Sequence, residues 1–366
     1  MRGLRELCLV ACAAAAFACD GDGNGDGDDG AETGGESGES GADEPPIPGT
    51  DGTGEPGPAG LFVAVGDGGR RASSADGASW EELIGSGVVD TSAEMGEEDI
   101  LRAVAVGEGV AIAVGGGGTD WTGNAMIMRT NDGLSWEEDL VGGMAELDER
   151  KLDAIGYSEG VFIAAGHQAH ILRSTDAGQT WARVYAEHPS RTTVFGVAGQ
   201  GETFVLVGMH QDDWDQPKVA YVHRSTDAGQ SFGAPSYFGD AGDQLVSIAS
   251  SGELFVAVGP AQCLRSPAGE DWEPCGLSAG GFGAVSYLNG YFVVSYLDGV
   301  STSTDGQAWS AHVVSPTGVP AEIVYGNGIY AGVRYYERGT SEALVDWSFV
   351  SHGAFPLRDL AFLPLE

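Results

Sequence analysis

Two stretches of the chain place a tryptophan among carboxylates, a combination suited to binding sugars or peptides. One is Asp120-Trp121, and the other is Asp212-Asp213-Trp214-Asp215. An indole ring offers a flat face for stacking, and carboxylates accept hydrogen bonds from hydroxyl and amide groups. We take these six residues as the candidate ligand-binding residues. The alternative is that each tryptophan packs onto its own loop.

Other residue types with catalytic potential form no recognisable site. His167 and His170 are three positions apart, and no cysteine or further histidine lies close to them in the sequence, as a metal site would need. Acidic residues are too numerous to choose a pair for glycoside hydrolysis. We therefore predict no catalytic residue, no metal site and no cofactor. A binding protein is the leading hypothesis, and a polysaccharide-active glycoside hydrolase is the alternative.

The first residues have the features of an export signal. Arg2 and Arg5 form a basic start, which is followed by an apolar run from Leu7 to Ala18. This run is shorter than the roughly twenty residues that a membrane-spanning helix needs. We therefore assign residues 1–18 to a signal peptide.

Cys19 stands directly after this run, in Ala16-Phe17-Ala18-Cys19. The segment is similar to the lipobox of bacterial lipoproteins, in which the cysteine is acylated and becomes the mature N-terminus, although Ala16 stands where leucine is usual. Two or three acyl chains hold a protein firmly on a membrane. We expect a lipid-anchored protein of the cell envelope, on either the inner or the outer membrane. Cys12 is the alternative lipidation site, and secretion without a lipid is the alternative fate.

The chain is strongly acidic, with 54 Asp and Glu residues against 17 Lys and Arg residues and a net charge of −37. That balance argues against nucleic-acid binding, which needs clustered cations. Residues 19–58 are mostly Gly, Asp, Glu, Ser and Pro, with no Lys or Arg. Such a segment cannot bury a core, so we expect a disordered tether between the lipid and a folded domain at residues 59–366.

Two cysteines, Cys263 and Cys275, lie in that domain. Export favours a disulfide between them. It would link neighbouring strands of one hairpin and stabilise the fold by about 3 kcal/mol. Two buried free thiols are the alternative.

The domain repeats a short apolar strand that is bounded by glycines. Clear copies are Gly60–Gly66, Val110–Gly115, Val161–Gly166, Thr203–Gly208 and Leu254–Gly259, and weaker copies are Tyr291–Tyr296 and Ile329–Arg334. Short apolar runs between glycines predict buried β-strands. Their recurrence at intervals of roughly 37 to 56 residues predicts a propeller or a related array.

A turn motif follows these strands, and its full form, Ser-x-Asp-x-Gly-x-Thr-Trp, occupies Ser174–Trp181. The aspartate accepts backbone N–H bonds in a tight turn, the glycine allows a positive φ, and the aromatic ring packs between sheets. We therefore expect a structural role for these residues rather than a catalytic one. The motif residues are Asp76, Trp80, Asp132, Trp136, Asp176, Trp181, Asp227, Phe232, Trp272, Asp305 and Trp309.

The motif resembles the Asp-box, or BNR repeat, of sialidases and many other propellers, and the resemblance covers nearly all of residues 59–366. Sialidases also carry an Arg-Ile-Pro motif, which this sequence lacks, and a Tyr–Glu pair. Tyr335, Tyr336 and Glu337 lie together, but we place them on one strand, where neighbouring residues face opposite ways. Sialidase activity is therefore not expected.

A third apolar segment precedes each glycine-bounded strand except the first, and the chain ends with an unpaired copy, Leu357–Leu363. We expect this last segment to become the innermost strand of the first blade, because closure pairs strand edges that would otherwise be exposed. The count then gives an all-β, seven-bladed β-propeller of four-stranded antiparallel blades.

The loops of such a propeller alternate between two faces. The Ser-x-Asp turns join strands three and four on one face, which we call the Ser-x-Asp face. Loops between strands two and three, and linkers between blades, lie on the loop-rich face, together with both tryptophan-bearing stretches. The domain also resembles the seven-bladed assembly factors related to the photosystem II stability factor, which hold protein partners. We expect a monomeric, non-catalytic binding or scaffolding propeller whose ligand is a glycan or an envelope protein.

Overall fold

The computed structural model describes residues 59–366 apart from 84–99, 118–123, 138–139, 142–143, 145–146, 148–149, 187–190, 214, 240–242, 278–280, 282, 353–355 and 366. The expected signal peptide, the tether and Cys19 lie outside the described residues, as do Asp120, Trp121 and Trp214. Within the described part of the chain, no helix has the length and apolar composition that crossing a membrane requires.

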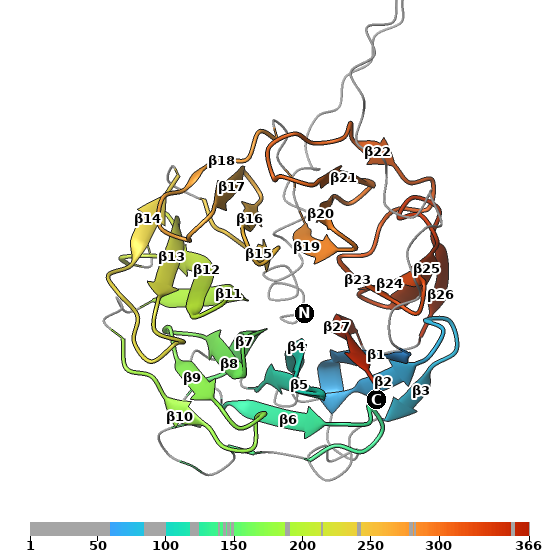
Figure 1. Cartoon of the computed structure of the whole chain (residues 1–366), viewed down its shortest axis with the longest axis horizontal. Coiled ribbons are helices and arrows are strands. Elements are labelled where there is room, and N and C mark those ends of the chain that lie inside the picture. Colours follow the sequence, from blue (N-terminus) through green and yellow to red (C-terminus); the bar gives the residue numbers. More distant parts are fainter. Residues whose placement is uncertain are drawn as a thin grey trace, which may run out of the picture.

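Seven antiparallel sheets stand around a central axis as the blades of a propeller (Figure 1). Six of the sheets have four strands, and the seventh, β4-β5-β6, is extended by a bridge between Arg129 and Glu137. The predicted fold class, an all-β propeller with seven blades, is confirmed.

Each blade runs from an innermost strand at the axis to an outermost strand at the rim. Blade 1 holds, in that order, β27 (Leu357–Pro364), β1 (Gly60–Gly66), β2 (Arg71–Ser74) and β3 (Glu81–Leu83), with a short 3-10 helix, η1 (Asp67–Gly69), after β1. Blade 2 holds β4 (Leu101–Gly107), β5 (Val110–Gly115) and β6 (Met126–Thr130). Blade 3 holds β7 (Leu152–Ser158), β8 (Val161–Gly166), β9 (Ile171–Ser174) and β10 (Ala182–Arg183). Blade 4 holds β11 (Thr192–Gln200), β12 (Thr203–His210), β13 (Val219–Ser225) and β14 (Ser236–Phe238).

The other three blades follow the same order. Blade 5 holds β15 (Ser247–Ser250), β16 (Phe255–Gly259), β17 (Gln262–Ser266) and β18 (Glu273–Pro274). Blade 6 holds β19 (Ala284–Leu288), β20 (Tyr291–Ser295), β21 (Gly299–Ser303) and β22 (Val313–Val314). Blade 7 holds β23 (Glu322–Gly326), β24 (Ile329–Arg334), β25 (Glu337–Ser341) and β26 (Ser348–Ser351).

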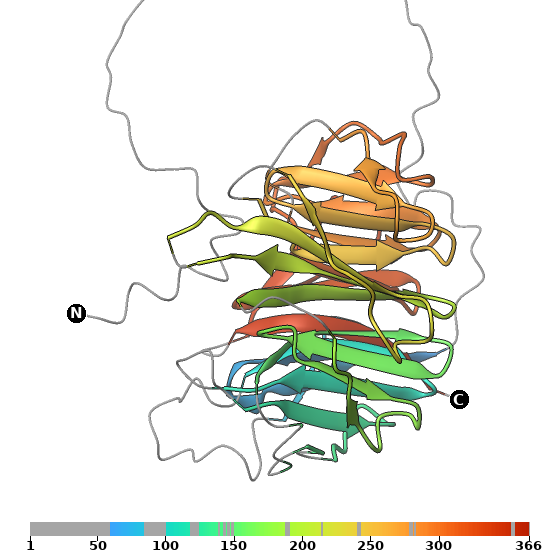
Figure 2. The same ribbon diagram turned by 90° about the vertical axis from the view of Figure 1, so that its left-hand side faces the viewer.

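The C-terminal strand closes the ring, as the unpaired last segment predicts. β27 pairs antiparallel with β1 along the whole of β1, so the two end strands of the described chain lie side by side (Figure 1). Figure 2 shows the same ring of blades from the side. Leu360 packs with the apolar side chains of blades 1 and 7, and Leu363 packs with those of blades 1 and 2. One strand therefore fills the innermost position of blade 1 and contacts the blades on either side.

A glycine at the end of strand two makes room for a β-bulge in the innermost strand. At Gly208, an added Cβ would lie 1.9 Å from the backbone oxygen of Thr193, and opposite this glycine β11 shifts register between Val194 and Gly196. Equivalent positions, where a Cβ would also strike a linker carbonyl beside a register shift, are Gly66, Gly115 and Gly166. Glycine is therefore required at these positions, because a backbone carbonyl oxygen occupies the space that a Cβ would need.

The aspartates hold the Ser-x-Asp turns. In blade 1, one carboxylate oxygen of Asp76 accepts the N–H groups of Ala78 and Ser79 at 2.9 and 2.7 Å. These bonds, with that of Ser79 the strongest cause, lower the pKa of Asp76 to about 2. Burial pulls the pKa of the other turn aspartates upward, but their hydrogen bonds outweigh it and lower the pKa of Asp132, Asp176, Asp227 and Asp305.

The same turns fasten each blade to its neighbour. Arg173, just before one turn, donates from Nε to the carbonyl oxygen of Ala228 in the turn of the next blade at 2.7 Å. Beside it, an added Cβ on Gly229 would lie 2.4 Å from Ile163 of the preceding blade. Arg129 and Arg224 make the same contact to Ala177 and Ala268 at 2.7 and 2.8 Å. The motif therefore sets the hairpin and also the packing between blades.

Blade 7 forms this turn without the motif aspartate and glycine. The indole N–H of Trp347 donates to the carbonyl oxygen of Leu344 at 2.7 Å, as that of Trp80 does to Gly77 at 2.7 Å. Leu344 has a φ of 66°, the left-handed conformation that glycine adopts in the other turns. The tryptophan therefore holds the turn in the same conformation, although the sequence motif is lost there.

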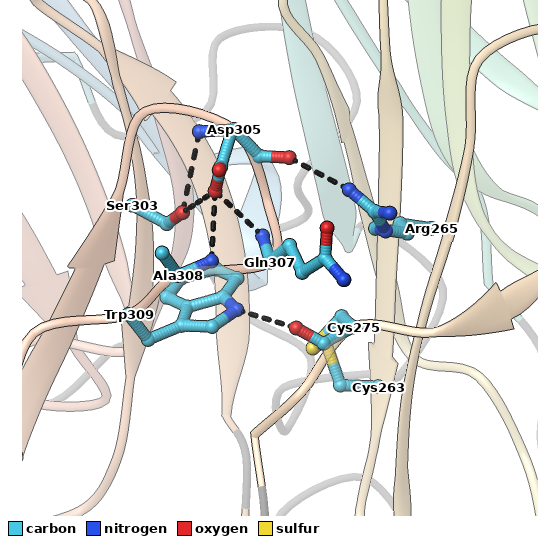
Figure 3. The surroundings of a disulfide bond; sticks show 8 residues. All are labelled: Cys263, Arg265, Cys275, Ser303, Asp305, Gln307, Ala308 and Trp309. Carbon is cyan, nitrogen blue, oxygen red and sulfur yellow. Dashed lines mark hydrogen bonds between the residues drawn. A yellow bond between two sulfur atoms is a disulfide. The ribbon is translucent and has the colours of Figure 1, made fainter.

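A disulfide joins Cys263 and Cys275 across strands three and four of blade 5, which confirms the predicted pairing. Figure 3 shows that it lies at the contact with blade 6. The indole N–H of Trp309 donates to the Cys275 carbonyl oxygen at 2.8 Å, and Arg265 donates to the Asp305 carbonyl oxygen at 3.2 Å. The crosslink therefore fixes a segment that also accepts a hydrogen bond from the next blade.

Candidate functional site

The described chain starts on the Ser-x-Asp face. Ala59 accepts a backbone hydrogen bond from Leu365 at 2.9 Å. The Asn327 amide donates to the carbonyl oxygens of Gly60 and of Ala75, in the blade 1 turn, at 2.9 and 2.7 Å. β1 then runs toward the loop-rich face. Residues that precede Ala59 are therefore joined to the face opposite the candidate site.

Three of the described candidate residues, Asp212, Asp213 and Asp215, lie in the loop between β12 and β13. Arg191 and His210 hold two of them. Arg191, in the linker before β11, pairs with the Asp213 carboxylate and donates to the backbone oxygen of Asp212 at 3.3 Å. The buried ring of His210 contacts the Asp212 carboxylate through Nε2 at 2.9 Å and the Thr192 hydroxyl through Nδ1 at 3.2 Å. The loop is therefore fastened to its own blade.

The carboxylates of this loop remain accessible to a partner. The side chains of Asp212 and Asp213 are 88% and 61% exposed, and Asp215 accepts a long hydrogen bond of 3.4 Å from Gln216. The ring of Tyr237 lies 5.3 Å from that of His210. Burial and the charge of Asp212 raise the pKa of Tyr237, so it stays a neutral donor beside the acidic loop.

The two tryptophan-bearing stretches belong to different blades. The first belongs to the β5–β6 connection of blade 2 and the second to the β12–β13 connection of blade 4, with blade 3 between them (Figure 1). Since Asp120, Trp121 and Trp214 lie outside the described residues, a ligand-binding role for this set stays a prediction.

The sequence did not point to an exposed apolar cluster on the loops of blades 6 and 7. Leu297 is 75% exposed, and Tyr335 and Tyr336 are 36% and 41% exposed. Tyr335 has a φ of 46°, and the two tyrosines form the turn between β24 and β25. Placing them with Glu337 on one strand was therefore wrong, because a left-handed residue ends the strand there. A turn without glycine or proline gave no signal in the sequence.

Two innermost strands, β23 and β27, carry neighbouring carboxyl groups. Asp359 on β27 accepts the backbone N–H of Val104 in blade 2 at 2.8 Å. Burial raises the pKa of Asp359 to about 7. Burial, followed by the charge of Asp359, raises the pKa of Glu322 on β23. Burial therefore favours the protonated form of both groups relative to exposed carboxyl groups.

The two histidines that were weighed as metal ligands contact other groups. His167 Nε2 lies 3.3 Å from the Asp153 carboxylate, and His170 Nε2 lies 2.9 Å from the Leu147 carbonyl oxygen. Burial lowers the pKa of His167 to about 4. Across the described residues, no three His, Cys, Asp or Glu side chains gather where they could hold a metal ion.

Two surface depressions lie at seams between blades. One, of about 370 Å³, is lined by residues that include Arg224, Ser231 and Glu270. The other, of about 170 Å³, is lined by residues that include Glu82 and Leu134. Both follow the turns and arginines that join neighbouring blades, and neither contains a candidate ligand-binding residue.

Comparison with known proteins identifies the fold of the chain but assigns it to no family. No family model matches the chain, and no curated protein matches it. The solved structure of YCF48 bound to D1 peptide is 15% identical, covers 68% of this chain and 81% of its own, and gives a TM-score of 0.50. YCF48 from Cyanidioschyzon merolae is 16% identical over 72% of this chain and 89% of its own, with a TM-score of 0.48. Apo AztD from Citrobacter koseri is 13% identical over 80% and 81%, with a TM-score of 0.49.

The class that fold and comparisons define is the seven-bladed β-propeller. At 15% identity, the structure of YCF48 bound to D1 peptide shares the fold with this chain, and the fold does not determine what the chain binds.

Proposed function

We propose that the chain is a non-catalytic binding or scaffolding propeller, built on Asp-box repeats and held at the cell envelope by a lipid on Cys19. Its partner is a protein that docks on the loop-rich face. The observation that carries this proposal is the separation of the two faces. The described chain begins at Ala59 on the Ser-x-Asp face, while exposed Leu297, Tyr336 and Asp212 lie on the opposite face. The described chain therefore begins on the face opposite these exposed side chains.

Two further points favour binding over catalysis. The turn aspartates accept backbone N–H bonds within their own turns, which is a structural role. YCF48 has been solved with a D1 peptide bound, so a propeller of this general shape can take a protein segment. The glycan ligand and the glycoside hydrolase remain as outcomes of the test below.

We expect the purified chain to bind members of a peptide array and to hydrolyse none of a panel of chromogenic glycosides. Hydrogen exchange with the strongest array ligand should show protection in peptides that contain the β12–β13, β20–β21 or β24–β25 loops. Those loops lie on the loop-rich face, where no strand pairing already shields them. Peptides that contain the Ser-x-Asp turns serve as the internal control and should exchange as before.

Either of two results would overturn the proposal. One is glycoside turnover that a single carboxylate substitution abolishes. The other is ligand protection confined to the Ser-x-Asp turns. Binding to a glycan array without turnover would keep the binding role and reject the protein partner.

The lipid anchor has a separate test. Mass spectrometry of the mature protein should find an acylated Cys19 at the N-terminus, and Cys19→Ala should move the protein from the membrane fraction to the soluble fraction, because acyl chains supply the membrane affinity. Cys12→Ala is the matched control and should leave the protein in the membrane. An unmodified N-terminus at Asp20, or acylation of Cys12, would contradict the assignment.

A further inference from the structure

The exposed cluster on blades 6 and 7 combines apolar and acidic groups. We define the blade 6–7 patch as Leu297, Asp298, Tyr335 and Tyr336. Leu297 and Asp298 lie in the β20–β21 loop, with Leu297 75% exposed and the Asp298 side chain 68% exposed. The tyrosine rings are 4.9 Å apart and inclined at 78°. Large apolar side chains so exposed on a loop contribute little to the core and are available to a partner.

A chain of contacts connects the two halves of the patch. The backbone oxygen of Asp298 accepts the N–H of Ser315 at 2.7 Å, and Ser315 in turn accepts the N–H of Gly318 at 3.1 Å. At Gly318, a Cβ position would lie 2.6 Å from the Arg334 guanidinium and 3.5 Å from the Leu297 carbonyl oxygen. Tyr335 follows Arg334 directly. Both loops therefore adjoin the segment from Ser315 to Gly318 at the seam between blades 6 and 7.

The cation nearest this surface is already engaged. Arg334 donates to the Glu337 carboxylate at 2.8 Å and to the Thr317 carbonyl oxygen at 3.0 Å, and it stacks on the Phe349 ring at 3.6 Å. Asp298 lies 3.2 Å from His312, whose ring packs edge-on against Tyr296 at 4.5 Å. The patch therefore presents tyrosine rings and a carboxylate outward, on a chain whose net charge is −37.

We propose that the blade 6–7 patch receives a basic segment of a partner protein, with a Lys or Arg side chain against Tyr336 and Asp298 and an apolar neighbour against Leu297. This inference rests on the proposed function and names the chemistry of the partner. A cation is attracted both to an aromatic face and to a carboxylate. The acidic surface of the domain also speeds the approach of a basic partner.

The ring geometry favours this occupant over a glycan. Sugars stack on one flat aromatic face, whereas the two tyrosine rings meet nearly at right angles. Such a corner surrounds a compact cation on two sides but offers no common platform.

The test is a titration of the full chain with a short fluorescein-labelled peptide of Lys, Arg and Leu, followed by anisotropy. Tyr336→Ala should weaken binding about fivefold through loss of the cation–π contact, and Asp298→Asn about threefold through loss of an exposed charge pair. High salt should weaken binding to the wild type, because the charges are exposed. Tyr287→Ala is the matched control. Tyr287 is 37% exposed at the end of β19 on the Ser-x-Asp face, and its loss should leave binding unchanged.

Several results would reject the patch. Equal loss of binding in Tyr336→Ala and Tyr287→Ala would show that the peptide is held by general charge attraction. Stronger binding of neutral oligosaccharides, or of a peptide in which Glu replaces Lys and Arg, would show that the patch takes a different ligand. In a third outcome, Asp212→Lys abolishes binding of the basic peptide and Tyr336→Ala leaves it unchanged. That result would place the binding site on blade 4 and would be consistent with the proposed function. Failure of the wild type to bind the basic peptide would reject the patch alone, since the array and exchange experiment decides the proposed function.

Discussion

Removal of residues 357–366 is expected to abolish the cooperative unfolding transition of the propeller. This deletion removes β27 and leaves β1 without a partner on its axial side. It also removes Leu357, Leu360 and Leu363, which are 2%, 3% and 0% exposed. Loss of one buried leucine side chain costs about 2–5 kcal/mol, so three amount to roughly 6–15 kcal/mol, against a total stability of about 5–15 kcal/mol for a typical domain.

Thermal melting followed by circular dichroism, together with limited proteolysis, would measure this effect. Deletion of residues 365–366 is the matched control and should preserve the transition, because Leu365 is 38% exposed and follows the strand. A synthetic peptide of residues 357–364 added to the longer deletion should restore protease resistance, since it supplies the missing strand. A deleted chain that melts cooperatively at the wild-type temperature would mean that the ring does not depend on this closure.

Much of the fold could be predicted because every blade needs the same buried strands and the same turn. Buried strands need apolar residues, and the turn between strands three and four needs an acceptor and a left-handed residue, so both leave residue types at fixed places. The reason for the glycine that ends strand two was not visible, since it depends on a linker carbonyl brought close by the fold. In blades 6 and 7, strand two ends at Ser295 and Arg334 rather than at a glycine, and the innermost strands pair without a register shift.

The candidate site was less accessible to sequence reasoning. Acidic residues near Trp214 suggested a binding rim, but nothing in the sequence indicated that Arg191, 21 positions before Asp212, donates to its backbone oxygen. The Tyr335–Tyr336 turn was assigned to a strand because its left-handed residue is not a glycine. The conformation of a loop depends more on the contacts around it than on the conformational preferences of its own residues. The strands were therefore predicted better than the site.

Gly208→Ala is expected to destabilise the propeller by about 3 kcal/mol or more, in the upper range for overpacked sites. The added methyl group would lie 1.9 Å from the backbone oxygen of Thr193 and 3.0 Å from the Cα of Val194. Neither atom can rotate away as a side chain would, so β11 must move from its bulge. For a domain of this size the melting temperature should fall by roughly 6 °C or more.

Substitution of two other glycines by alanine measures the effects of the change where no backbone atom is in the way. Gly252 has a φ of 89° with no atom within 4 Å of an added Cβ, so Gly252→Ala should cost only the left-handed strain of about 1–2 kcal/mol. At Gly233 the nearest atom to an added Cβ is 3.9 Å away and φ is not positive, so Gly233→Ala should be neutral or slightly stabilising. Melting temperatures should therefore rank Gly233→Ala above Gly252→Ala, with Gly208→Ala well below both. If Gly208→Ala melts together with Gly252→Ala, the Thr193 carbonyl does not constrain this position, and the bulge in β11 is not the reason for this glycine.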